Sequence, residues 1–201
     1  MDIEGKYTLQ ASPEVVWIHL MDLQTLQRTI PGIVGLERPG EDMYAFTLHV
    51  KHAPLRGSFS GYAVATELEY PFSYQMRAEG EGIPGKFHAE WNITLTAHDE
   101  NTIVAYQSSL HYSKANALLP NPLIKGTIKV LIQHFFTALA DHLRSTSYSY
   151  LATSEDTGTQ LEVSQIYNDH RTASTYPDQP IFLHTIVRRL GLGDKDPLLE
   201  Q

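Results

Sequence analysis

The sequence predicts an α+β domain in which an antiparallel sheet packs against one long C-terminal helix. Apolar and polar residues alternate through most of residues 33–113, as in strands with one buried and one solvated face. Between residues 124 and 143 the apolar residues instead recur every three or four positions, as in an amphipathic helix. Turn signals separate the alternating segments, so consecutive strands are expected to be antiparallel neighbours.

The N-terminal segment predicts one strand followed by two short helices. Residues 2–10 alternate in the manner of a half-buried strand. Ser12 and Pro13 then predict a helix start, with the serine as cap and the proline at the first helical position. A second short helix is expected over residues 22–29, before the turn Ile30-Pro31-Gly32.

Six further strands are expected in the central part of the chain. The pattern places them at residues 33–38, 43–52, 55–68, 72–80, 87–97 and 102–113. The clearest is 87–97, where Phe87, Ala89, Trp91 and their alternate successors are apolar. Short loops and strict alternation together predict an antiparallel sheet with one wet face.

The long helix explains how the sheet is covered. Its apolar stripe runs from Ile124 to Leu143, and an amphipathic helix of this length needs an apolar partner surface. The inner face of the sheet is the large apolar surface available. We therefore assign residues 1–146 to one domain.

The rest of the chain has a different character. Residues 147–180 lose periodicity and are rich in Ser, Thr, Asp and Gln, so we expect a polar linker that is mostly disordered. Residues 181–201 begin with a short basic amphipathic segment, for which we expect contact with a membrane, a partner or its own domain. The residues predicted for that contact are Phe182, Ile186, Arg188, Arg189 and Leu190.

Composition excludes several classes of function. The chain has no cysteine, which removes disulfides, thiolate metal sites and cysteine nucleophiles. Its net charge of −8 argues against nucleic-acid binding. Of its ten histidines, His49 and His52 point to opposite faces of a strand, so we expect no metal site. We expect no secretory signal and no membrane span, because no apolar stretch has the required character or length.

The stretch GEGIPGKF, residues 80–87, resembles two nucleotide-binding motifs, but its context contradicts both. Such motifs lead into a helix, whereas the alternation after Lys86 predicts a strand, and Phe87 stands where a magnesium-binding hydroxyl is needed. We interpret the stretch as a β-hairpin whose glycines supply positive φ angles. We expect its turn to border the mouth of a cavity, with Gly82, Ile83, Pro84 and Gly85 as the mouth residues.

The inner face of the sheet contains many small residues. If the odd positions of strand 57–67 face inward, they present Gly61, Ala63 and Ala65 to the helix. Small residues there must be filled by large opposing side chains or leave a cavity, and the sequence leaves both alternatives open, as it does the inward register. For a cavity, the predicted ligand-binding residues are Trp17, Phe46, Leu48, Phe59, Ala63, Tyr74, Met76, Phe87, Trp91, Gln107, Ser109, Ile128, Leu131 and Phe135.

Gln107 and Ser109 belong to that set because polar groups on an inward face could orient a ligand carbonyl or hydroxyl. The alternative is that the opposite face of strand 102–113, with Tyr106 and Leu110, points inward and these residues are solvated.

Several local motifs resemble the CoxG family, which is named for a component of carbon monoxide dehydrogenase and belongs to the START-like, polyketide-cyclase-like (SRPBCC) superfamily. They are Ile3-Glu-Gly-Lys-Tyr-Thr-Leu9, Ser12-Pro13, Val16-Trp17, Leu26 with Ile30-Pro31-Gly32, Leu55 to Gly61, and Gly80-Glu-Gly82 with Gly85. The resemblance implies the helix-grip fold, a curved seven-stranded antiparallel sheet wrapped around the C-terminal helix. It also implies a cytoplasmic accessory protein of an oxidoreductase, peripheral on the inner face of the cell membrane, with a cavity for a lipid or quinone.

Three hypotheses of function follow. The leading one is non-catalytic binding of a lipophilic molecule, with no covalently bound cofactor. The second is a cyclase-like enzyme, for which Tyr74 or His111 could serve as the acid or base; no catalytic triad can be assembled from the sequence. The third is an assembly module that binds partners but no ligand.

Overall fold

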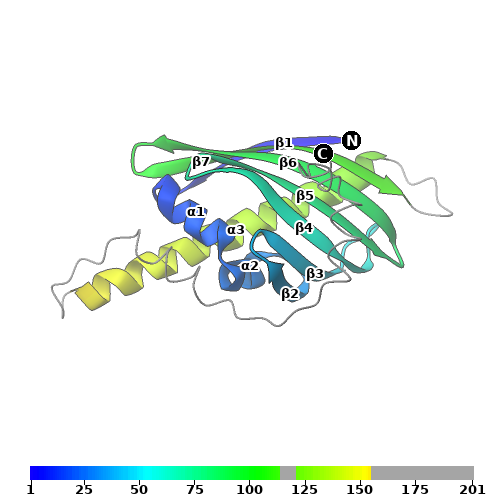
Figure 1. Cartoon of the computed structure of the whole chain (residues 1–201), viewed down its shortest axis with the longest axis horizontal. Coiled ribbons are helices and arrows are strands. Elements are labelled where there is room, and N and C mark those ends of the chain that lie inside the picture. The colour runs from blue at the N-terminus through cyan, green and yellow to red at the C-terminus, as the bar shows by residue number, and fades with distance from the viewer. Residues whose placement is uncertain (114–120, 155–201) are drawn as a thin grey trace, which may run out of the picture. The chain divides into compact units, whose positions relative to one another are not determined.

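The computed structural model describes residues 1–113 and 121–154. Along the chain, the elements are β1 (Asp2–Leu9), α1 (Pro13–Met21), α2 (Leu23–Thr29), β2 (Ile33–Gly40), β3 (Met43–Val50), β4 (Gly57–Glu69), β5 (Ser73–Gly82), β6 (Gly85–His98), β7 (Asn101–Ser113) and α3 (Asn121–Ser154). This order confirms the α+β fold class and every predicted strand and helix within the described residues (Figure 1).

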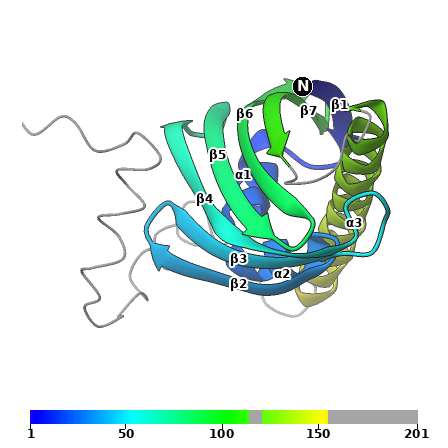
Figure 2. The ribbon, with the colours of Figure 1, turned by 90° about the vertical axis from the view of Figure 1, so that its right-hand side faces the viewer.

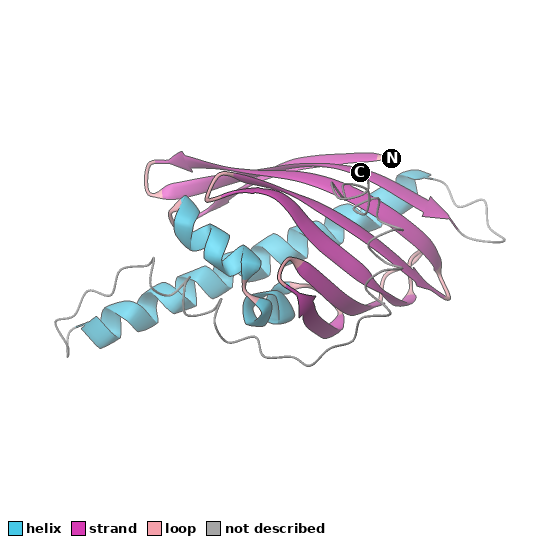
Figure 3. Cartoon of the chain, in the orientation of Figure 1, coloured by secondary structure: helices cyan, strands magenta, loops and turns pink. Residues whose placement is uncertain are grey.

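The seven strands form one antiparallel sheet in the order β1-β7-β6-β5-β4-β3-β2. Strands β2 to β7 follow one another as a meander, whereas β1 pairs with β7 at the far edge. The connection from β1 to β2 therefore has to cross from one edge of the sheet to the other. Helices α1 and α2 make this crossing, and Figure 3 shows them at one end of the curved sheet with α3 running along its concave side.

Helix α3 covers the sheet through its apolar stripe. Phe136, Leu139 and Leu143 are buried together with Ile3 and Leu9 of β1 in the main hydrophobic core. Burying these side chains is the principal favourable contribution to packing the helix on the sheet. The opposite face of the helix is exposed.

Helix α3 continues to Ser154, so residues 147–154 at the start of the predicted linker are helical; the rest of the linker and the tail lie outside the described residues, and the division into domains stays a prediction. We also expected no segment able to span a membrane, but Pro122–Thr146 passes that test by length and composition, with a mean hydropathy of 1.2. Its apolar stripe packs on the sheet, as in the core helix of a globular domain.

The predicted helix caps are partly correct. Ser12 occupies the N-cap position of α1, but its side chain makes no capping hydrogen bond. Asp22, between the two short helices, is the working cap: its carboxylate accepts hydrogen bonds from the backbone N–H of Thr25, at 2.7 Å, and from the Thr25 hydroxyl, at 2.8 Å.

A polar cluster around Thr25 joins α1, α2 and α3. The Thr25 Oγ1 lies 3.1 Å from Nδ1 of His19 and 3.3 Å from Nε2 of His142. Because the hydroxyl gives its single hydrogen to Asp22, both rings must donate to it, which assigns the protons to Nδ1 of His19 and Nε2 of His142. The cluster is therefore satisfied with both histidines neutral.

This cluster predicts a pH dependence of stability. Burial, and next the charge of His142, lowers the pKa of His19 from its ordinary 6.5, while Asp22 acts in the opposite sense. The folded state thus binds the proton less readily than the unfolded chain, and the free energy of unfolding should fall as the pH drops through 6.5 towards the lower folded pKa. Because His19 is only partly buried, we expect a loss below about 1 kcal/mol.

Denaturant unfolding at pH 7.5 and pH 5.5 (about one pH unit on either side of 6.5) measures this loss. His19→Asn keeps an N–H near the Nδ1 position without a titrating ring, so it should reduce the difference between the two values. The matched control is His98→Asn, at the exposed end of β6. If the free energy of unfolding changed equally with pH in the unmodified chain and in both variants, His19 would not be the cause of the loss.

Candidate functional site

The inward-facing residues of the sheet follow the alternation that the sequence predicts. One row across the concave face pairs Tyr44 with Ala63, Ala63 with Ala78, Ala78 with Ala89, and Ala89 with Leu110. Three consecutive alanines on three adjacent strands leave the middle of the sheet without side-chain bulk. The odd positions of β4 therefore face inward, which fixes the register that the sequence left open.

The neighbouring row has glycines at its centre, and close packing explains them. It pairs Phe46 with Gly61, Gly61 with Gly80, and Gly80 with Phe87. A Cβ at Gly61 would lie 1.9 Å from the carbonyl oxygen of Glu79, and a Cβ at Gly80 would lie 2.6 Å from the Phe87 ring. These two glycines thus permit close approach.

A cavity of about 410 Å³ lies between this hollow and helix α3. The volume is in the range of pockets for small organic ligands. Its walls come from the concave face of the sheet, from one side of α3, and from α2 with the turn that follows it. The structure thus favours the cavity over the fully packed core.

Most of the predicted ligand-binding residues line this cavity: Phe46, Leu48, Phe59, Ala63, Tyr74, Met76, Phe87, Trp91, Ile128, Leu131 and Phe135. That they contact a ligand remains a prediction.

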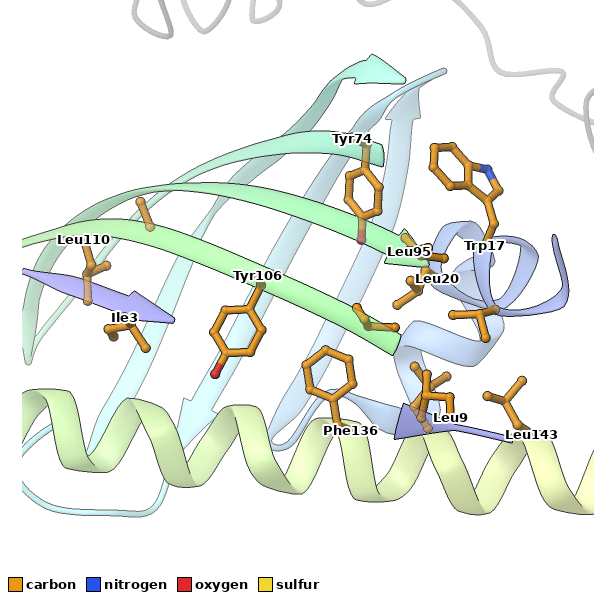
Figure 4. Packing of buried hydrophobic residues seen from close by; sticks show 14 residues of the cluster. Ile3, Leu9, Trp17, Leu20, Tyr74, Leu95, Tyr106, Leu110, Phe136 and Leu143 are labelled. Carbon is orange, nitrogen blue, oxygen red and sulfur yellow. The ribbon is translucent and has the colours of Figure 1, made fainter. Parts of the chain in front are cut away.

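Three predicted residues do not line it. Gln107 and Ser109 are exposed on the outer face of β7, because the even positions of this strand, with Val104 and Tyr106, point inward. Trp17 is 1% exposed but lies outside the cavity, where its ring packs edge-on against Tyr74 with centroids 5.4 Å apart (Figure 4). Its indole Nε1 is buried without a hydrogen-bond partner in the described part of the chain.

The predicted mouth turn touches the site only indirectly. Gly82, Ile83, Pro84 and Gly85 do not line the cavity, but the hydroxyl of Tyr112, which does, donates a hydrogen bond to the carbonyl of Pro84. Within the turn only Gly85 has a positive φ, of 149°, so the predicted positive φ at the other glycines of this stretch is wrong. A role for the turn as a gate stays a prediction.

The polar groups of the cavity are hydroxyls. Those of Tyr74, Tyr106 and Ser108 have no hydrogen-bond partner among the described residues. In Figure 4 the rings of Tyr74 and Tyr106 project from their strands towards α3. Tyr44 and Tyr112 also line the cavity, but their hydroxyls donate to the carbonyls of Met21 and Pro84.

Burial keeps these tyrosines neutral. It raises the pKa of Tyr74, with a smaller contribution from nearby Tyr44, and it raises the pKa of Tyr106, with a smaller contribution from Tyr7. Both hydroxyls therefore remain protonated donors throughout the physiological pH range. They are suited to donate to an oxygen atom of a bound molecule, and no charged side chain lines the described cavity.

Sequence reasoning missed several lining residues. Leu26, Ile30 and Pro31 reach the cavity because the edge-to-edge connection carries α2 below the sheet, which no local pattern reveals. Tyr106 and Ser108 were recoverable, since they share the even face of β7 with Leu110.

Among the residues whose side chains the structure describes, no three potential metal ligands come together. The predicted tail contacts Phe182, Ile186, Arg188, Arg189 and Leu190 lie outside the described residues.

Comparisons with solved structures support the fold. A conserved protein from Geobacillus kaustophilus is 31% identical, with a TM-score of 0.70, and the alignment covers 73% of this chain and 97% of that one. A START superfamily protein from Mycobacterium smegmatis is 12% identical, with a TM-score of 0.58 and coverage of 72% and 98%. Ara h 8.0201 is 14% identical, with a TM-score of 0.55 and coverage of 72% and 98%. The last two likenesses show the fold alone.

Sequence comparison identifies the family. No curated protein matches the chain. The family model of CoxG, described as a subunit of carbon monoxide dehydrogenase, matches residues 5–144, which include nearly all of the seven strands and most of the described part of α3. The chain therefore belongs to the CoxG family and has a START-like, helix-grip fold.

Proposed function

We propose that the domain binds a lipophilic small molecule, a quinone or a lipid, in the cavity between the sheet and α3, without catalysing its reaction. The observation that carries this proposal is the 410 Å³ apolar space lined by three hydroxyls that have no partner among the described residues. An apolar wall with a few convergent polar groups is the usual composition of a small-molecule pocket.

The lining favours a neutral ligand with an oxygen acceptor. A buried carboxylate or phosphate needs a cationic partner, and no Lys, Arg or His lines the described cavity. A carbonyl needs only a donor, which Tyr74, Tyr106 or Ser108 could supply. A quinone is neutral and has carbonyl acceptors, so it fits this lining better than a fatty-acid anion does.

The family supports an accessory role. CoxG proteins are named as a component of carbon monoxide dehydrogenase, and we infer that this chain serves an oxidoreductase of that kind as a ligand carrier or recruitment factor. Its location would be cytoplasmic and peripheral on the membrane, with the tail segment around Phe182 and Arg188 as one contact. A cyclase-like enzyme is less well supported, because the described residues that line the cavity include no acid or base other than tyrosine.

Solvent extraction of the purified chain followed by mass spectrometry tests the proposal directly. We expect a quinone or neutral lipid to accompany the protein, or the apoprotein to take up decylubiquinone. Recovery of apoprotein that takes up neither quinones nor lipids would overturn it.

The cavity should tolerate a larger side chain at one alanine and not at its neighbour. Ala78 lines the cavity, so Ala78→Leu should place its side chain in the empty space, raise stability by about 1 kcal/mol and block decylubiquinone binding. Ala89 is paired with Ala78 but is 0% exposed and does not line the cavity, so Ala89→Leu should destabilise by about 1–3 kcal/mol. Thermal unfolding and quenching of Trp91 fluorescence measure both effects; equal destabilisation by the two variants would mean that no open space exists beside Ala78.

The hydroxyls of β7 should contribute to affinity. Tyr106→Phe combined with Ser108→Ala removes two donors and should weaken decylubiquinone binding about thirtyfold, since each hydrogen bond contributes on the order of 1 kcal/mol. Tyr112→Phe is the matched control, because its hydroxyl already donates to Pro84. Isothermal titration of the three proteins gives the affinities. Unchanged binding in the double variant would show that the ligand head lies elsewhere.

A further inference from the structure

One end of the domain combines basic and apolar groups on an otherwise acidic chain. This end, which we call the basic end, comprises the β3–β4 loop (51–56), the β5–β6 turn and the first turns of α3 (Figure 2). The three segments are adjacent. The hydroxyl of Thr127 in α3 donates to the carbonyl of Ala53 at 3.0 Å, and a Cβ on Gly57 would lie 2.5 Å from Pro84.

The charge of the basic end is opposite to that of the chain. Residues 43–66 and 101–140 contain no Asp or Glu, although the net charge of the chain is −8. Lys51, Arg56, Lys125 and Lys129 form no ion pair with any described residue. Near this end, Glu81 of β5 forms an ion pair with Lys86 at 2.6 Å, and Asp2 lies at the start of β1.

Two large aliphatic side chains stand out from the same end. Ile83, at the tip of the β5–β6 turn, is 97% exposed, and Leu123, in the first turn of α3, is 59% exposed. Both are among the more exposed apolar side chains of the described residues, and neither is needed for packing the core.

The cavity lies directly behind this surface. Leu55, between Pro54 and Arg56 in the β3–β4 loop, is buried in a cluster with Val50, Phe59 and Ile124. Leu55, Val50 and Phe59 also line the cavity. The loop that carries two of the unpaired cations on its outer side therefore forms the cavity wall on its inner side.

We propose that the basic end docks on the surface of an anionic lipid bilayer. The four cations would contact lipid phosphates, and Ile83 and Leu123 would enter the interfacial region. Each Lys or Arg close to an anionic leaflet adds favourable binding energy, and so does the insertion of exposed aliphatic side chains. Single aliphatic side chains exposed at a turn tip and a helix start suit a deformable apolar medium. This docking surface rests on charge and exposure, so it does not depend on which ligand the cavity holds.

Because the chain has no cysteine, single labelled cysteines can report which end meets the membrane. Ile83→Cys and Leu123→Cys carry an environment-sensitive fluorophore at the basic end. Phe72→Cys is the control: it is 62% exposed and lies at the β4–β5 turn, at the opposite ends of these strands. The full-length chain is mixed with phosphatidylcholine vesicles that contain or lack phosphatidylglycerol. We expect a blue shift at positions 83 and 123 with the anionic vesicles alone, and no shift at position 72.

A charge-reversal pair tests the cations independently. Lys51→Glu with Lys125→Glu should reduce flotation with anionic vesicles about tenfold. Lys6→Glu with Arg28→Glu changes the net charge equally, at exposed positions on β1 and α2, and should reduce flotation much less.

Several results would overturn the proposal. One is an equal loss of flotation in both double charge-reversal variants, which would mean that binding depends on the net charge of the chain and not on this surface. Another is flotation that Arg188→Glu with Arg189→Glu abolishes while the probes at 83 and 123 show no shift, which would assign binding to the tail. Absence of binding to anionic vesicles would also overturn it and would leave an acidic protein as the occupant of this surface. Ligand extraction is a separate measurement, so failure here does not bear on the cavity.

Discussion

The contact between α3 and the concave face of the sheet is the constraint on which the rest of the structure depends. The helix must lie over the sheet to bury its apolar stripe, and the small residues Ala63 and Ala78 lie beneath it. At ordinary packing density their missing side-chain volume has to be replaced from the helix or left open. Ile128, Leu131 and Phe135 only border the space. The cavity thus arises because the middle of the sheet lacks large side chains. The aromatic residues on either side of the alanines hold the helix and the sheet apart.

The connection from β1 to β2, made by α1 and α2, is the second structural requirement, because it supplies the part of the cavity wall that the sheet and α3 do not form. Helix α2 and the turn after it, with Ile30 and Pro31, reach the cavity only when α1 and α2 are held against α3. The Thr25 cluster provides that attachment through His19 and His142, with one shared hydroxyl and no surplus donor. The residues of the Thr25 cluster do not line the cavity. The side chains that attach the helices are therefore different from the hydroxyls that are available to a ligand.

Periodicity was sufficient for much of this architecture. Alternation along β3, β5 and β6 identified the inward face, because a one-residue slip would have exposed Tyr74 and Trp91 together, whereas the inward register of β4 had to come from the structure. On β7 both faces carry some apolar residues, so the alternation does not identify the inward face. The prediction that Gln107 and Ser109 contact a ligand was wrong, because both are exposed on the outer face. Trp17 was misplaced because Tyr74 lies between it and the cavity, a tertiary relation that no helical stripe encodes.

A crystal structure of the full chain grown with decylubiquinone tests the central claim, that the cavity receives a neutral lipophilic molecule, most directly. We expect the quinone in the space beside Ala63 and Ala78, with a carbonyl oxygen about 3 Å from the hydroxyl of Tyr74, Tyr106 or Ser108. A structure in which Ile128, Leu131 and Phe135 have closed onto the alanines, leaving neither ligand nor cavity, would contradict it.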